Sequence, residues 1–308
     1  MDLFSYLLSK NSSGGKGDID WSAIGYSETP QTIVNDYNHA KEIYDNWDAS
    51  KTMQNDKELV IAPFVDTSNK IDMTSMFNGC TYLTTVPLLD TSNATNMTNM
   101  FHYCTNLISV PLLDTSKVTN MYGMFTGCAR ITTIPLLNTS SVENMSYMLY
   151  DCTNLISIPL LDTSKVTNMY GMFQNCKALT TIPLLDTSNV TSMISMFQSC
   201  TNLISIPLLN TSKVTNMSNM FQVCSNLTTV PLLNTSSVTN MNNMFLSIMK
   251  LSDESLDNIL QMCINATSYN GTKKLTTLGI SNRSYYPVSR IEALSHYQDF
   301  IDAGWTIG

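Results

Sequence analysis

A strict period of 24 residues runs through most of the chain and constrains its fold more than any other feature. The period is visible as a column of prolines: Pro63, Pro87, Pro111, Pro135, Pro159, Pro183, Pro207 and Pro231. It is visible again as a column of cysteines: Cys80, Cys104, Cys128, Cys152, Cys176, Cys200 and Cys224. Repeat arrays form one continuous body that grows with each unit, so the 308 residues need not divide into separate globular domains.

The first half of each unit has a pattern typical of a strand. The spacing Leu-x-x-Leu-x-Leu, here Leu107, Val110 and Leu112, predicts a short strand in the parallel sheet of a leucine-rich repeat. Proline cannot donate a hydrogen bond to a sheet. We therefore expect each strand to be short and to end near the step into its proline.

The second half of each unit predicts a helix. Five apolar residues recur there at steps of three or four and define one helical face: Val118, Met121, Met124, Phe125 and Cys128. Asp-Thr-Ser, between the two halves, is a turn and helix-start cluster. The chain is therefore predicted to be an α/β repeat, a solenoid of about eight 24-residue coils with short parallel strands and helical N- and C-terminal caps.

Segments that do not repeat flank the coils and divide the chain into four parts. We assign 1–18 to an apolar N-terminal peptide with a Gly/Ser linker and 19–58 to an N-terminal helical cap. Residues 59–248 form the leucine-rich-repeat solenoid, and 249–308 form a C-terminal cap.

Both caps are expected to contain helices. The first opens at Thr29 and carries an apolar stripe of Ile33, Tyr37, Ala40, Tyr44 and Trp47. Ser252 is expected to begin a second helix, with Leu256, Ile259, Leu260 and Cys263 on one face. Residues 275–280 are predicted to add one more strand, and 289–303 a last amphipathic helix.

The composition excludes several classes of function. The formal net charge is −8 and the pI is near 4.7, which argues against nucleic-acid binding. No stretch reaches the roughly 18 apolar residues that would span a bilayer, so we expect no membrane insertion. The N-terminus has an apolar run but no basic region before it, so we expect no secretion signal of the usual kind.

Two columns of side chains could carry chemistry, although a structural role is favoured for each. Neighbouring cysteines could form disulfides, but their side chains should point inward in parallel, which favours reduced core packing. A second column could recruit calcium: Asp66, Asp90, Asp114, Asn138, Asp162, Asp186, Asn210 and Asn234. Because Asp and Asn interchange there, the shared property is an oxygen acceptor, which favours a turn or helix cap. We predict no metal site and no cofactor.

Methionine and asparagine columns also have structural explanations. Met at helical spacing, such as Met121 and Met124, is expected to fill the core. The Asn before each such Met, such as Asn120, is expected to satisfy backbone groups at a bend. The histidines, His39, His102 and His296, lie in different parts of the chain, and no catalytic motif is present. The sequence therefore predicts a protein that is not an enzyme.

The repeat motif resembles a known family. Phe-x-x-Cys-x-x-Leu-x-x-Ile-Pro, followed by Asp-Thr-Ser-x-Val-Thr-Asn-Met-x-x-Met-Phe, resembles the BspA-like leucine-rich-repeat surface proteins over residues 57–248. The resemblance implies a right-handed solenoid on a cell or particle surface, often adhesive. The two ends of the chain resemble those of phage structural proteins, which implies a phage- or prophage-associated variant whose residues 1–17 dock to virion structural proteins.

The exposed positions give the candidate binding residues. A column of hydroxyl side chains is expected on the sheet face: Thr85, Ser109, Thr133, Ser157, Thr181, Ser205 and Thr229. It either simply suits an exposed sheet or binds a glycan or protein. Other exposed positions vary more, and among them Tyr122 and Tyr170 could anchor a sugar or partner protein.

These observations favour a surface-display or adhesion module. It would sit on a virion or an extracellular surface and bind a host-surface glycan or protein. The alternative is a self-assembling scaffold or filament, because solenoid ends expose unpaired strand edges. A homo-oligomer is compatible with either hypothesis.

Overall fold

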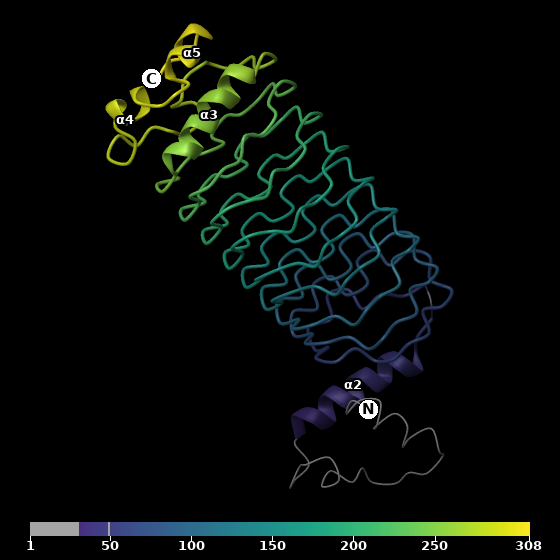
Figure 1. Ribbon diagram of the computed structural model, residues 1–308. Helices are drawn as coiled ribbons and strands as arrows, with labels where there is room; N and C mark the ends of the chain where they lie inside the picture. Colours follow the sequence, from purple (N-terminus) through teal and green to yellow (C-terminus); the bar gives the residue numbers. More distant parts are fainter. Residues whose placement is uncertain (1–30, 49) are drawn as a thin grey trace.

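The structure, a computed structural model, is an elongated array of stacked coils with helices at its two ends (Figure 1). It describes residues 31–48 and 50–308, so the predicted N-terminal peptide and linker lie outside the described residues. Helix α2 (Gln31–Asp45) lies at the N-terminal end. Helices α3 (Asp253–Asn265), α4 (Val288–Glu292) and α5 (Tyr297–Asp302) lie together at the C-terminal end.

The coils stack in parallel register, each residue lying beside the one 24 positions away. An unbroken series of isolated parallel bridges joins Asp72, Asn96, Asn120, Asn144, Asn168, Ser192, Asn216 and Asn240. Around this series, Thr119 N donates to Thr95 O at 3.0 Å and Met121 N donates to Asn144 O at 3.1 Å. The backbone hydrogen bonds between coils therefore begin at the Thr-Asn-Met step and continue through the residues that follow it, for example from Phe125 N to Met148 O, whereas fewer form at the predicted strand.

The predicted strand is reduced to single hydrogen bonds. Ile108 N donates to Thr84 O at 3.0 Å, but bridges form in this column only between Ile61 and Thr85 and between Ser205 and Thr229 among the described residues. After the proline, Leu112 points to solvent whereas the next residue, Leu113, is buried. Leu112, the last residue of the predicted strand pattern, therefore lies outside the core.

The predicted helix in each repeat is also wrong, since the described coils between α2 and α3 contain none. In residues 121–128, amide groups bond alternately to the next coil and three residues back. Gly123 N donates to Ser146 O at 3.0 Å, whereas Met124 N donates to Met121 O at 3.2 Å. Gly123 and Gly127 have φ of 60° and 72°, and a left-handed residue cannot continue a right-handed helix. The segment is a chain of turns.

The apolar pattern nevertheless identifies the core correctly. Val118, Met121, Met124, Phe125 and Cys128 are all fully buried, as are their counterparts in the neighbouring coils. Consecutive phenylalanine rings stack with centroids 5.4–5.8 Å apart, for example Phe77 on Phe101. The core is therefore one continuous column running along the array.

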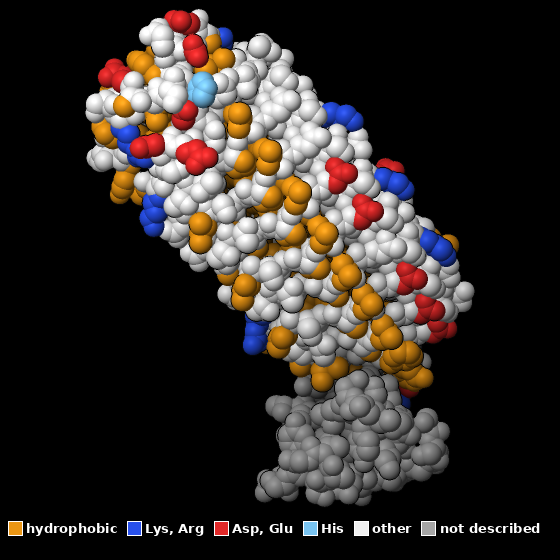
Figure 2. All heavy atoms as spheres, in the orientation of Figure 1, with side chains coloured by type: hydrophobic (Ala, Val, Ile, Leu, Met, Phe, Trp, Pro, Cys, Tyr) orange, Lys and Arg blue, Asp and Glu red, His pale blue; other side chains and the backbone are white. Residues whose placement is uncertain are grey.

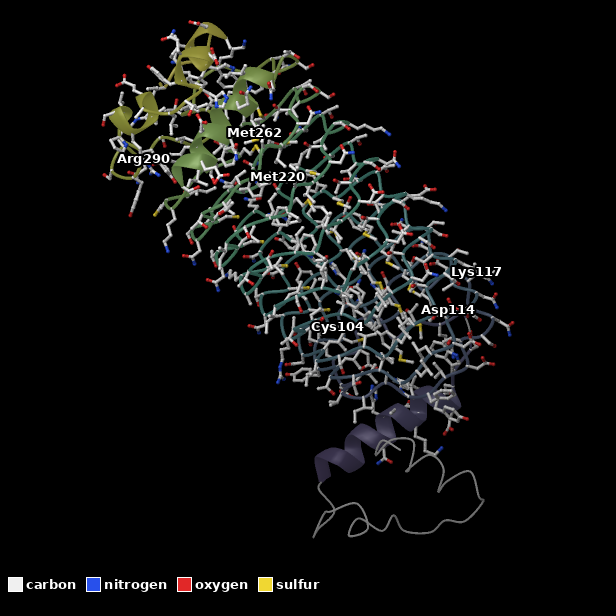
Figure 3. All side chains as sticks on the ribbon, viewed as in Figure 1. Cys104, Asp114, Lys117, Met220, Met262 and Arg290 are labelled. Carbon is white, nitrogen blue, oxygen red and sulfur yellow. The ribbon has the colours of Figure 1, made fainter. Side chains whose placement is uncertain are left out.

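The cysteines are free and buried, as predicted, and each thiol of the repeat column has a hydrogen-bond partner. Cys104 Sγ donates to Phe77 O at 3.0 Å, and Cys128 Sγ donates to Phe101 O at 3.1 Å. Figure 3 shows Cys104 inside the array, whereas Asp114 and Lys117 lie at its edge. The thiol therefore satisfies a backbone carbonyl that faces the core.

Burial should make these thiols unreactive in the folded protein. It raises the pKa of all eight, to about 12 for Cys80 and Cys224, whereas the thiolate is the reactive form. We expect no reaction with Ellman's reagent at pH 8 in native buffer, and reaction of all eight in guanidinium chloride. Raising the pH above about 8.5 should also destabilise the fold, because only the unfolded chain then releases thiol protons. Fast labelling of any native thiol would contradict this assignment.

The helices at the ends match the sequence in part. In α2, Ala40 is buried and Ile43 packs on the core, whereas Tyr44 is exposed, contrary to expectation. The side chains of Ile33 and Tyr37 lie outside the described residues.

At the C-terminal end, Ser252 caps α3 as predicted, since Ser255 N donates to Ser252 Oγ at 3.1 Å. Residues 275–279 stack on the last coil as turns and not as a strand, with Asn243 N donating to Thr277 O at 2.8 Å.

The single last helix predicted over 289–303 is two short helices, α4 and α5. The chain between them is held by Asp257, which accepts hydrogen bonds from His296 N at 2.9 Å and pairs with His296 Nδ1 at 2.8 Å. These contacts turn the chain before α5 begins. Among the helices that the structure describes, none has the length and apolar character needed to cross a membrane.

Candidate binding surfaces

A row of exposed aliphatic side chains, here called the leucine ladder, runs along one face of the array (Figure 2). Its members have between 42% and 63% of their surface exposed: Phe64, Leu88, Leu112, Leu136, Leu160, Leu184, Leu208 and Leu232. Phe64 comes from a Pro-Phe-Val triplet, and the other members are the first leucine of each Pro-Leu-Leu triplet, whose second leucine is buried. The sequence does not single out this row, because both leucines of a triplet fit a core pattern.

An acidic row lies beside the leucine ladder, formed by the Asp and Asn column of the sequence. Asp90 Oδ1 accepts hydrogen bonds from Ser92 Oγ at 2.7 Å and Ser92 N at 3.0 Å. These two bonds lower the pKa of Asp90, and the same pair of bonds lowers the pKa of Asp66, Asp114, Asp162 and Asp186. The predicted turn role is confirmed, and the row also presents oriented carboxylates that are ionised at neutral pH.

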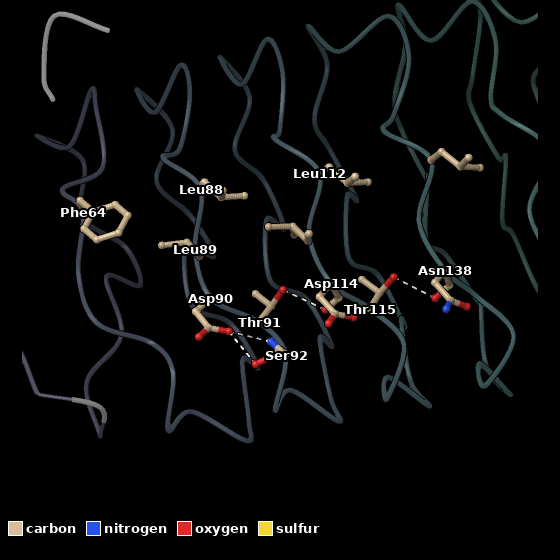
Figure 4. A pocket seen from close by; sticks show the side chains of 12 residues that line it. Phe64, Leu88, Leu89, Asp90, Thr91, Ser92, Leu112, Asp114, Thr115 and Asn138 are labelled. Atoms are coloured by element: carbon tan, nitrogen blue, oxygen red, sulfur yellow. Dashed lines mark hydrogen bonds between the residues drawn. The ribbon is translucent and has the colours of Figure 1, made fainter. Parts of the chain in front are cut away.

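The ladder and the acidic row form a shallow groove at the N-terminal half of the array (Figure 4). Its volume is about 710 Å³, and its walls include Phe64, Leu88, Leu112 and Leu136. Asp90 and Asp114 line one side of it. Threonines below the acidic row stiffen this wall, since buried Thr91 Oγ1 donates to Asp114 O at 2.8 Å. The groove is thus apolar along the leucine ladder and carries carboxylates along the acidic row.

The predicted hydroxyl column lies on the surface, and its members are exposed except for Ser205, which is half-buried. Exposed isoleucines stand beside every second member, at Ile108, Ile156 and Ile204. Tyr122 and Tyr170 do not join this column, because they lie in the turn segment of their coils. Binding by the hydroxyl column stays a prediction.

Tyr122 and Tyr170 belong instead to an aromatic group, here called the tyrosine cluster, together with Tyr147 and Tyr150. The ring of Tyr147 meets the rings of Tyr122, Tyr150 and Tyr170 edge to face, with centroids 5.8, 5.6 and 4.8 Å away. The cluster spans three successive coils. Tyr147, the central ring, and Tyr150 are not among the binding residues predicted from the sequence.

Tyr147 has an unusual backbone conformation, with φ of 56°. A bulky residue in the left-handed region costs about 1–3 kcal/mol. Gly171 in the next coil makes room for the ring, because a Cβ at Gly171 would lie 2.8 Å from Tyr147 Cδ1. Tyr103, with φ of 54°, lies over Gly127 in the same way, since a Cβ there would come within 2.5 Å of the Tyr103 ring.

Histidines and carboxylates pair at the two ends of the array. His39 Nε2 lies 2.7 Å from Asp56 Oδ2, and His296 Nδ1 lies 2.8 Å from Asp257 Oδ2. Within residues 31–48 and 50–308, no group of three or more His, Cys, Asp or Glu side chains is placed to hold a metal ion. The asparagine column is used structurally as predicted, since Tyr122 N donates to Asn120 Oδ1 at 3.0 Å.

Comparison with known families identifies the repeats. A family described as "Mycoplasma protein of unknown function, DUF285" matches four overlapping stretches, at residues 42–157, 71–182, 105–203 and 154–259. The chain belongs to this family. The overlapping matches reflect the repeats, because the family pattern fits the DUF285 coils in more than one register. No curated protein sequence matches the chain.

Solved structures similar to this DUF285 chain are bacterial leucine-rich repeat proteins. A leucine-rich repeat protein of T. pallidum is 18% identical, with a TM-score of 0.42, over 66% of this chain and 81% of its own. One from Eubacterium ventriosum is 15% identical, with a TM-score of 0.34, over 57% and 56%. A leucine-rich cell surface protein of Faecalibacterium prausnitzii is 17% identical, with a TM-score of 0.32, over 57% and 60%. The chain thus spans less than two thirds of the last two.

Proposed function

We propose that this DUF285 protein is a recognition module that binds another protein through the leucine ladder. One observation carries the proposal: leucines with 60–63% of their surface exposed recur in successive coils along one face. Single exposed leucines are ordinary on protein surfaces, whereas contiguous apolar strips with a polar rim mark sites of interaction. The acidic row supplies that rim and favours a partner with basic groups beside its apolar contacts.

The location and the docking peptide predicted from the sequence are part of the proposal. We propose that the module acts outside the cell, in adhesion to a host surface, and that residues 1–17 dock it to a virion or to another particle. Its solenoid would be right-handed, with about eight coils that present the ladder between capped ends. Uniform coils support this proposal, since they build a long surface in which no coil is specialised for catalysis.

A double substitution in the ladder tests the function. Leu112→Gln with Leu136→Gln removes apolar surface from the groove but leaves the exposed side chains similar in size. Wild-type and variant proteins are immobilised, exposed to surface proteins of the source culture and of its host, and compared by quantitative mass spectrometry. The affinity of each differentially retained protein is then measured after purification. We expect the double substitution to raise the Kd at least tenfold, or by about 1.4 kcal/mol.

Ile108→Gln with Ile156→Gln is the matched control, because these aliphatic side chains are comparably exposed but lie outside the ladder. Both double variants should keep the stability of the wild type to within about 0.5 kcal/mol per site. Equal binding by the ladder variant and the wild type would refute the proposal. If sedimentation shows a wild-type dimer or filament that the ladder variant dissolves, the ladder is a self-assembly interface, and the alternative hypothesis holds.

A further inference from the structure

Tyr147, the central ring of the tyrosine cluster, differs from the residues at the same position in the other coils. At the position of Tyr147, the other coils have residues that tolerate or favour a left-handed backbone: Ser75, Asn99, Gly123, Gly171, Ser195, Asn219 and Asn243. Tyrosine is unfavourable in that conformation. Nothing in the stacking of the coils requires an aromatic ring there, because seven other coils stack without one. The ring is therefore available for a role other than the stacking of coils.

The neighbouring residues preserve the ring in this position. Gly171 leaves the space that the ring of Tyr147 covers, and a side chain there would meet Tyr147 Cδ1 and Cε1 at 2.8 Å. The rings of Tyr122 and Tyr170, from the coils on either side, then meet its edges and faces at 77° and 70°. The result is one connected aromatic group, whose rings meet edge to face, and not a set of separate exposed rings.

Amide side chains and a carboxylate lie at the border of the tyrosine cluster. Gln174 Nε2 donates to Gln198 Oε1 at 3.0 Å, which holds the Gln174 side chain in place and leaves its own carbonyl oxygen as an acceptor. Asn175 Nδ2 donates to Asp151 Oδ1. Together with the phenol groups, these side chains offer both donors and acceptors at the edge of an aromatic surface.

We propose that the tyrosine cluster, with Gln174 and Asn175, binds a neutral saccharide chain. The face of an aromatic ring carries partial negative charge, which attracts the C–H groups on the face of a sugar ring. The amides and phenols match sugar hydroxyl groups, which both donate and accept hydrogen bonds. The site is separate from the leucine ladder and does not depend on the function proposed for it.

The charges and the ring geometry of the tyrosine cluster disfavour the other ligands that aromatic groups bind. The phenols of the cluster are uncharged at neutral pH, because the pKa of tyrosine is ordinarily about 10, and burial together with the hydrogen bond to Tyr170 raises the pKa of Tyr147 further. Asp151 adds a negative charge, which opposes an anionic ligand. A quaternary ammonium ion requires ring faces that surround it, whereas the rings here meet edge to face.

Native gel electrophoresis with a soluble neutral polysaccharide in the gel tests the proposal. The probes are glucomannan, xyloglucan, laminarin, yeast mannan and galactan, with heparin as an anionic comparison and choline as a competitor. We expect at least one neutral polysaccharide to slow the wild-type protein, with no effect of choline. Tyr147→Asn should abolish the retardation and leave the Tm equal to or above that of the wild type, because other coils carry Asn at this position.

Two further variants make the result decisive. Tyr122→Ser, at a side chain 37% exposed, should weaken retardation at least fivefold, and Tyr285→Asn, an exposed tyrosine in the C-terminal region, should leave it unchanged. The leucine-ladder variant should also bind the polysaccharide normally, which separates this proposal from the proposed function. The proposal is overturned if no neutral polysaccharide slows the wild type, if Tyr147→Asn is slowed equally, or if it loses stability and binding together.

Discussion

Replacing Phe173 by Ala is expected to lower the free energy of unfolding by about 3–5 kcal/mol, which is the range for a fully buried phenylalanine. Phe173 is completely buried and stacks on Phe197, with ring centroids 5.5 Å apart and planes within 2°. On its other side the same column holds Leu149, which is buried too. Truncation would open a cavity in the middle of the array, and urea denaturation followed by circular dichroism measures the loss.

The control for this substitution is Leu160→Ala in the leucine ladder, at a side chain 63% exposed. It should change stability by less than about 0.5 kcal/mol. Since coils in a solenoid contact only their neighbours, hydrogen exchange in the Phe173 variant should accelerate most in the adjoining coils. A loss under about 1 kcal/mol would show that Phe173 is not a core residue.

Gly279→Ala is expected to have the second large effect. Gly279 has φ of 96°, and an added Cβ would lie 2.4 Å from both the N and the Cα of Leu246. Backbone atoms cannot move aside as a flexible side chain can. The conformation should contribute roughly 1–3 kcal/mol, and the clash roughly 1–3 kcal/mol more. Thermal unfolding of the purified variant provides the measurement.

Gly304→Ala separates these two contributions. Gly304 also has a left-handed backbone, with φ of 85°, but an added Cβ there would meet nothing within 4 Å. This variant should therefore lose only the conformational part, roughly 1–3 kcal/mol. Equal losses in the two variants would mean that the backbone of Leu246 yields to the new methyl group, against our expectation.

The burial pattern could be predicted from the sequence, but the local backbone could not. Met121, Met124 and Phe125 recur at helical spacing and do point inward. The same spacing, however, fits successive turns that bond three residues back. What distinguishes them is the pair of left-handed residues in each coil, and only some coils mark these positions with glycine, as at Gly123 and Gly127.

The candidate binding surfaces were harder to predict for a related reason. Leu112 and Leu113 are the same residue type, so the sequence does not show which one is exposed. The backbone conformation after Pro111 decides it. Tyr122 and Tyr170 were singled out from the sequence as exposed aromatics, whereas Tyr147 was not. Its significance depends on its backbone angle and on the glycine under its ring, neither of which a single repeat unit reveals.

The uniform register of the coils has a consequence for how such a protein can change in evolution. Unequal recombination between the near-identical DNA repeats that encode the coils would insert or delete whole coils. The hydrogen-bond pattern between the remaining coils would stay the same. Each inserted coil would lengthen the leucine ladder by one rung and the molecule by about 4.8 Å. The number of coils would therefore set the length of the leucine ladder in fixed steps, while the tyrosine cluster stays intact on its own coils.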